Sequence, residues 1–209
     1  MPQTDRFMKA DIGRQPDVLR SLSPGLAVLH DRASALATMG LMGRIWVIGC
    51  GDGLFAAEAV AAEARGAGLD WQAVGPMDLL VEPGRVGPAD IAVLMSMSGN
   101  VDRTVEAATL VRDRGLRLLA IVNGDGGRLG ALVPDRWSMD LPDLAQFLCG
   151  TASFAATVAA LLTIAAGLSG RARPDLDGAA AIMAQADGVA DGATAGLDLA
   201  SVTGLRFLA

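Results

Sequence analysis

The feature that most constrains this sequence is residues 90–113, which predict a buried strand, a short polar turn and an amphipathic helix. Residues 91–95 form an unbroken apolar run, which is typical of a central parallel strand covered on both faces. Residues 96–100, with the sequence Ser-Met-Ser-Gly-Asn, form the turn. Apolar side chains then recur at helical spacing and predict one buried helix face. That face is expected to contain Val101, Val105, Ala108 and Val111.

The polar turn has the composition of an anion-binding loop. Ser96 and Ser98 supply two hydroxyl groups, and Gly99 lets the backbone approach a ligand closely. Because a helix follows the turn, we expect free backbone N–H groups and the positive end of the helix dipole beside these hydroxyls. Such an arrangement binds phosphate. The alternative is that Ser98 or Asn100 only caps the helix.

This Ser-x-Ser-Gly-Asn motif, followed by a helix that begins near Thr104-Val-Glu-Ala, resembles the signature of the sugar isomerase (SIS) domain family. The resemblance implies an α/β fold: a three-layer αβα sandwich around a central five-stranded, mainly parallel sheet, with flanking N- and C-terminal helices. It implies a phosphosugar ligand and no metal ion or other cofactor. The expected phosphate-binding residues from this motif are Ser96, Ser98, Gly99 and Asn100.

The rest of the chain supplies the other elements of such a fold. Further strands are expected at residues 44–48, 71–74, 116–122 and 137–140. Helices are expected over residues 4–38, from the first strand to about residue 65, and over residues 144–170 and 175–191. The predicted organisation is a helical segment at residues 1–40, a SIS domain at 41–170, and at 171–209 a helix with the first strand of an otherwise absent second SIS domain.

The glycine-rich loop at residues 49–53 has more than one interpretation. A dinucleotide-binding G-x-G-x-x-G motif fails because Leu54 occupies its last position. The sequence Gly-Cys-Gly-Asp-Gly also resembles the loop of S-adenosylmethionine-dependent methyltransferases, although Val47 stands where those enzymes usually carry an acidic residue. The third interpretation is the first loop of a SIS domain, in which Gly51 and Asp52 border the phosphosugar.

Two later segments resemble a SIS subgroup that includes tagatose-6-phosphate isomerases and galactosamine-6-phosphate deaminases. Asn123-Gly-Asp125-Gly follows the fourth strand, at the edge where α/β sheets bind ligands, and is expected to lie near the site. It could equally be a glycine turn with an Asx-type aspartate. Thr151 lies in a segment similar to the family's element in which a helix N-terminus caps the phosphosugar.

The sequence departs from the family pattern in three ways, and these departures leave two hypotheses for the function. Asp52 and Gly53 replace a pair of hydroxyl residues, and a carboxylate there would repel a phosphate. Val101 replaces a phosphate-facing threonine, and the second domain is missing. One hypothesis is a sugar-phosphate isomerase or amino-sugar-phosphate deaminase completed by another chain. The other is a non-catalytic regulatory module that binds a sugar phosphate. The catalytic residues are not identified by either hypothesis.

Composition limits the other function classes. The net charge of −6 and the lack of a basic patch argue against nucleic-acid binding. Cys50 and Cys149 lack metal-type spacing, which favours a reducing, cytoplasmic setting. With one histidine, His30, and one lysine, Lys9, acid–base chemistry is expected to use Asp and Glu, with further groups from a partner chain. We therefore expect a homodimer or higher homo-oligomer.

The long uncharged segment at residues 144–170 has two interpretations. Its length would allow a membrane span. However, alanine, threonine, glycine and serine dominate it, rather than leucine and isoleucine, and Gln146 interrupts it. The sequence therefore predicts a helix buried between domains or subunits, with no membrane contact.

Overall fold

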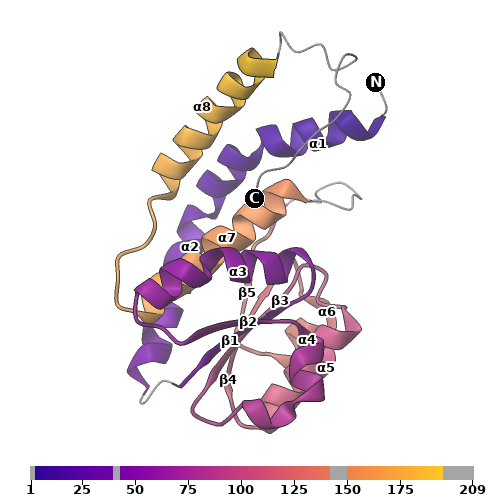
Figure 1. Ribbon diagram of the computed structural model, residues 1–209, viewed down its shortest axis with the longest axis vertical. Coiled ribbons are helices and arrows are strands. Elements are labelled where there is room, and N and C mark those ends of the chain that lie inside the picture. The colour runs from indigo at the N-terminus through magenta and orange to yellow at the C-terminus, as the bar shows by residue number, and fades with distance from the viewer. Residues whose placement is uncertain (1–2, 40–42, 142–149, 195–209) are drawn as a thin grey trace.

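A five-stranded sheet with only parallel neighbours forms the centre of the protein, which we describe from a computed structural model over residues 3–39, 43–141 and 150–194 (Figure 1). The strand order is β2-β1-β3-β4-β5, and every neighbouring pair is parallel. The predicted fold class, an αβα sandwich with a five-stranded sheet, is confirmed. The strands are β1 (Ile45–Gly49), β2 (Trp71–Val74), β3 (Ile91–Ser96), β4 (Arg117–Val122) and β5 (Arg136–Ser138).

Strand β3 is central because its sequence can be buried on both faces. All six of its residues are buried. Successive side chains point to opposite faces of a strand. Ile91 and Val93 therefore join the core under one helical layer, whereas Ala92 and Leu94 join the core under the other. The absence of apolar/polar alternation in residues 91–95 thus predicted the position of the strand correctly.

One face of the sheet is covered by three long helices, α2 (Gln15–Thr38), α3 (Asp52–Gly66) and α7 (Thr151–Leu168) (Figure 1). Helix α7 is long and apolar enough to cross a membrane by composition, but 67% of it is buried inside the protein, where it packs against α2 and α3. The segment from residue 151 onward is therefore buried as predicted, but against helices of the same chain; burial between domains or subunits stays a prediction. Residues 144–149 lie outside the described part of the chain.

The other face is covered by α4 (Pro76–Val81), α5 (Asp102–Asp113) and α6 (Gly127–Leu132), and a 3₁₀ turn, η1 (Pro83–Arg85), precedes β3 (Figure 1). Helices α4 and α6 were not predicted, because each is short and follows proline- or glycine-rich sequence. The buried face of α5 also differs from the expected one. Val101 precedes the helix and is exposed, and the buried residues are Thr104, Ala107, Ala108 and Val111.

The chain leaves β1 and β3 toward opposite layers. The β1–β2 connection uses α3 on one face, whereas the β3–β4 connection uses α5 on the other face. The strand order therefore reverses between β1 and β3. In open α/β sheets the loops diverge at such a switch point and leave a crevice at the carboxyl ends of the strands. The loops that contain residues 50–51 and 97–101 meet at this crevice.

Two outer helices complete the described chain. Helix α1 (Gln3–Gly13) packs against α2 and α7, and α8 (Leu176–Thr194) packs along α2, so that both extend away from the sheet (Figure 1). The predicted flanking helices are thus present. The expected strand of a second domain, at residues 204–209, lies outside the described residues, and the boundaries near residues 40 and 170 stay predictions.

Asp90 should be a large contributor to the stability of the sheet. It is 9% exposed and accepts hydrogen bonds from the backbone N–H groups of Arg44 and Gly87 and from Nε1 of the buried Trp46, each at 2.9 Å. Asp90→Ala leaves these donors unpaired and should cost about 3 kcal/mol of unfolding free energy in urea denaturation. Asp70→Ala, which removes an exposed carboxylate near β2, should cost less than about 1 kcal/mol. Equal losses would contradict this prediction.

Candidate functional site

A cavity of about 310 Å³ lies at the switch point between β1 and β3. Its walls come from the loops after these two strands and from the first turns of α7. Apolar side chains such as Met95, Met139 and Phe154 form part of the lining. The polar lining consists mainly of hydroxyl groups, from Ser96, Ser98, Thr104, Ser153 and Thr157.

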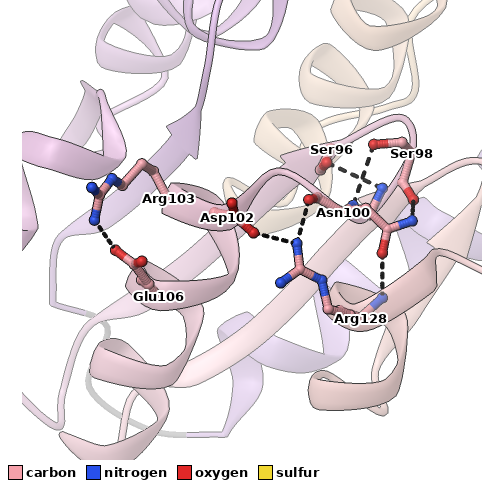
Figure 2. A network of polar contacts seen from close by, with 8 residues as sticks. Ser96, Ser98, Asn100, Asp102, Arg103, Glu106 and Arg128 are labelled. Carbon is pink, nitrogen blue, oxygen red and sulfur yellow. Dashed lines mark hydrogen bonds and ion pairs between the residues drawn. The ribbon is translucent and has the colours of Figure 1, made fainter.

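The two serines of the loop hold its backbone in place. Ser96 Oγ accepts a hydrogen bond from the N–H of Gly99 at 3.1 Å, and Ser98 Oγ accepts one from the N–H of Asn100 at 3.2 Å (Figure 2). The expectation that these two N–H groups are free was therefore wrong. A serine hydroxyl that accepts one hydrogen bond still has its own hydrogen to donate. The loop thus offers a ligand its hydroxyl groups.

Gly99 is required by the packing of this loop. Its φ of +64° lies in the left-handed region, and a Cβ atom there would stand 1.7 Å from the carbonyl oxygen of Gly126. The carbonyl oxygen of Gly99 also accepts a hydrogen bond from the N–H of Leu129 at 2.9 Å. The loop is thus pressed against the start of α6, and only glycine allows this approach.

Asn100 belongs to the loop, but its side chain is turned toward α6. Its Oδ1 accepts a hydrogen bond from the N–H of Arg128 at 3.2 Å, and its Nδ2 donates to the carbonyl oxygen of Ser98 at 2.9 Å (Figure 2). The residue before α5 is Val101, and no side chain caps that helix. Neither Ser98 nor Asn100 therefore acts as the cap of α5, and Asn100 satisfies an N–H group at the start of α6 instead.

The first loop brings two ionisable groups to the cavity, the Cys50 thiol and the Asp52 carboxylate. Gly51, with φ of +53°, precedes α3 and shapes the turn without lining the cavity. Asp52 is exposed in the first turn of α3 and makes no hydrogen bond or ion pair that is seen among the described residues. The Cys50 sulfur lies 3.7 Å from Thr104 Oγ1. No arginine, lysine or histidine lines this cavity within the described chain.

Thr151 lies beside a second, mainly apolar cavity of about 640 Å³ between α2, α7 and α8, which shares Asp52 and Phe154 with the first. The Thr151 hydroxyl donates to Asp11 Oδ2 at 2.7 Å, and the N–H of Ala152 donates to the same oxygen at 3.0 Å. A carboxylate from α1 therefore caps the N-terminus of α7 and interacts favourably with its dipole.

Asn123 and Asp125 bind backbone groups near the cavity without lining it. Asn123 Nδ2 donates to the carbonyl oxygen of Leu141 at 3.1 Å, and Asn123 Oδ1 accepts from the N–H of Leu141 at 2.8 Å. This pair of bonds joins the ends of β4 and β5. Asp125 Oδ1 accepts from the N–H of Gly127 at 3.0 Å, as expected of an Asx turn.

Two hydroxyl residues of the cavity, Thr104 and Thr157, were missed in the sequence, whereas Ser153 lies in the segment that resembles the family's phosphosugar-capping element. Thr104 is fully buried on the sheet-facing side of α5, and a polar residue at an apolar helical position was the available signal. Ser153 and Thr157 are four residues apart on α7, which places their side chains on one helix face. In the described residues there is no cluster of three His, Cys, Asp or Glu side chains that could hold a metal ion.

Comparisons with known proteins identify the fold. No family model matches the chain. A 48-residue segment, 23% of this chain and 24% of its relative, is 40% identical to a phosphoheptose isomerase from Aromatoleum aromaticum. Two similar solved structures are the tagatose-6-phosphate ketose/aldose isomerase from Escherichia coli (TM-score 0.71, 18% identity) and the glucosamine-6-phosphate deaminase from Thermotoga maritima (TM-score 0.67, 14% identity).

These matches cover most of this chain but only part of the other proteins. The chain is covered to 89% and 85%, respectively, whereas it spans 53% of the E. coli enzyme and 57% of the T. maritima enzyme. The chain therefore has the fold of phosphosugar isomerases, the SIS fold that its motifs indicated, and corresponds to about half the length of these two structures.

The cap that Asp11 provides to α7 should be measurable as stability. Asp11→Ala removes the acceptor for Thr151 Oγ1 and for the N–H of Ala152, and should lower the unfolding free energy by about 1 kcal/mol. Asp11→Asn keeps an acceptor oxygen and should lose about half as much. Urea denaturation checks both variants, and an Asp11→Ala protein as stable as the parent would show that the cap contributes nothing.

Proposed function

We propose that this chain binds a sugar phosphate in the 310 Å³ cavity and serves in a sugar-phosphate isomerase or amino-sugar-phosphate deaminase. The observation that carries this proposal is the convergence of five hydroxyl side chains at the switch point of the sheet. Such edges are where open α/β sheets bind ligands. The similarity of the fold to phosphosugar isomerases supports the same class of ligand.

In this proposal the two ends of the cavity have different roles. Ser96 and Ser98 lie at the junction of β3 and α5 and donate their hydroxyl hydrogens to the phosphate, whereas Thr104 is fully buried in the cavity wall. Ser153 and Thr157 face the cavity from α7 and contact the sugar hydroxyls. Neutral donors can hold a phosphate when several act together, since each hydrogen bond to a charged group contributes about 1.5–3 kcal/mol.

Interconversion of an aldose and a ketose moves a proton between adjacent carbon atoms, and so needs a general base. Asp52 and Cys50 are the ionisable side chains that line the cavity among the described residues. We therefore propose that further acid–base groups come from a second copy of the chain or from another protein, and that the active protein is a homo-oligomer.

A second candidate function is a regulatory module that binds a sugar phosphate without converting it. Two observations favour it: the cavity is rich in hydroxyl groups and poor in acid–base groups, and Asp52 stands beside it without a neutralising partner among the described residues. The two candidates differ in turnover rather than in the site of binding.

A titration separates these candidates. The protein is mixed with galactosamine 6-phosphate, fructose 6-phosphate and the corresponding unphosphorylated sugars; calorimetry measures binding, and NMR in deuterated water detects proton exchange on the sugar carbon atoms. Phosphate-dependent binding with turnover supports the enzyme, and binding without turnover supports the module. Thermal stabilisation by S-adenosylmethionine, with no sugar bound, would instead favour a methyltransferase.

Ser98 provides a test of the hydroxyl cavity, because it lines the cavity and is exposed, whereas Thr104 is fully buried. Ser98→Ala removes the hydroxyl group and should weaken sugar-phosphate binding about five-fold, the equivalent of one hydrogen bond of about 1 kcal/mol. The control is Thr109→Val on α5, whose hydroxyl bonds to the carbonyl oxygen of Val105. If both variants bind as tightly as the parent, Ser98 does not contact the ligand.

Asp52 should oppose a phosphate. Asp52→Ser removes the carboxylate and introduces a hydroxyl, and it should strengthen sugar-phosphate binding about three- to ten-fold at low salt by removing a like-charge interaction of about 1 kcal/mol. The gain should shrink in 0.5 M salt, where screening is stronger. Glu58→Gln removes an exposed charge from the same helix away from the cavity and serves as the control. A loss of affinity in Asp52→Ser would mean that Asp52 contacts the ligand favourably.

A further inference from the structure

The loop at residues 96–101, which we call the serine loop, lies between the cavity and the start of α6. Its serines line the cavity, whereas its carbonyl groups at Gly99 and Asn100 are bound by residues at the start of α6. The N–H of Leu129 donates to the carbonyl oxygen of Gly99 at 2.9 Å, and the N–H of Arg128 donates to Asn100 Oδ1 at 3.2 Å. Helix α6 therefore holds the side of the loop that faces away from the cavity.

The Arg128 side chain adds a second attachment. Its Nη2 donates both to the carbonyl oxygen of Asn100 and to Asp102 Oδ1, in the first turn of α5 (Figure 2). One guanidinium group thus joins the end of the serine loop, the start of α5 and the start of α6. The bonds that Ser96 and Ser98 accept lie within the loop itself and do not connect it to a neighbouring helix.

We propose that Arg128 is a positioning residue for ligand binding, which fixes the serine loop so that the Ser96 and Ser98 hydroxyls converge on the ligand. The proposal rests on the proposed function, because it assigns a role to the loop in holding a sugar phosphate. Binding groups that are fixed before the ligand arrives lose less conformational entropy on binding, so a loop held in advance binds more tightly.

Arg128 also neutralises a charge close to the loop. The hydrogen bond from Arg128, together with its positive charge, holds the pKa of the Asp102 carboxyl below its usual value, as expected when the guanidinium group stabilises the carboxylate. Without Arg128, a bare carboxylate would stand at the N-terminus of α5, two residues beyond Asn100, and would oppose an anionic ligand. The effect of Arg128 on loop geometry and its effect on charge both favour the binding of an anionic ligand.

Because the ion pair between Arg128 and Asp102 is exposed, its effect on the serine loop can be distinguished from an effect on global stability. The side chains of Arg128 and Asp102 are 53% and 75% exposed. Exposed ion pairs contribute little to global stability and are screened by salt. Removal of Arg128 should therefore disturb the loop and ligand affinity while it leaves the melting temperature almost unchanged.

The test compares Arg128→Ala and Arg128→Lys with the parent protein. The matched control is Arg112→Ala, since Arg112 is similarly exposed, lies in the last turn of α5 and pairs with the adjacent Asp113. The Arg103 side chain, which pairs with Glu106, is not used as a control because its charge also acts on Asp102 (Figure 2). Hydrogen–deuterium exchange of the peptide that covers residues 96–101 measures the order of the loop, and calorimetry with fructose 6-phosphate measures affinity. Melting temperatures are recorded for every variant.

Arg128→Ala should accelerate exchange in the serine loop at least five-fold and weaken fructose 6-phosphate binding about five- to ten-fold. Arg128→Lys should recover part of both, because an ammonium group can still bond to Asn100 and Asp102, and Arg112→Ala should change neither. The proposal is overturned if loop exchange in Arg128→Ala equals that of the parent, or if affinity is unchanged while exchange accelerates. If the parent protein binds no sugar phosphate, the proposed function fails. The role of Arg128 in ordering the loop is judged separately, and it is contradicted if Arg128→Ala leaves loop exchange unaltered.

Discussion

The structure depends on the burial of β3 on both of its faces. A strand without a polar face must lie inside the sheet and must be covered by helices on both sides. Because β1 and β3 are neighbours whose connections run to opposite layers, the loops after them diverge and leave space at the carboxyl edge. The position of the candidate site is thus a consequence of how the apolar strands are covered.

Most polar groups of the serine loop bond to the loop itself or to the start of α6. The serine loop satisfies two of its own N–H groups with the Ser96 and Ser98 hydroxyls, and its carbonyl groups at residues 99 and 100 are bound by the start of α6. The N–H groups of Gly99 and Asn100 are therefore not free for a ligand. Hydroxyl hydrogens remain, and a cavity lined in this way suits a polyhydroxylated molecule that can both accept and donate hydrogen bonds.

Charge is arranged less favourably for an anion than the motif suggested. Helices α3 and α5 both direct their N-termini toward the site, and each carries an aspartate in its first turn, Asp52 and Asp102. A carboxylate at this position offsets the positive end of the helix dipole. Asp102 is paired with Arg128, whereas Asp52 has no such partner among the described residues. Asp52 is therefore the charge that most distinguishes this site from one made for phosphate alone.

The sequence alone predicted the architecture and the loop that borders the candidate site. Apolar runs without alternation predicted the central strands, and the Ser-x-Ser-Gly-Asn motif marked the loop that lines the cavity, because both signals are local in the chain. Short helices such as α4 and α6 were missed, since proline and glycine gave no periodic pattern there. The direction in which Asn100, Asn123 and Thr151 point was also beyond the sequence.

Only the tertiary structure decided those directions, because each depends on a partner far away in the chain. Asn100 faces Arg128, 28 residues later, and Thr151 faces Asp11, 140 residues earlier. The contribution of Ser153 and Thr157 to the cavity likewise depends on how α7 packs over the sheet. Local pattern indicates which hydroxyl and amide side chains follow the strands, whereas the packing of distant helices decides which of them face the cavity and which are used to hold the fold together.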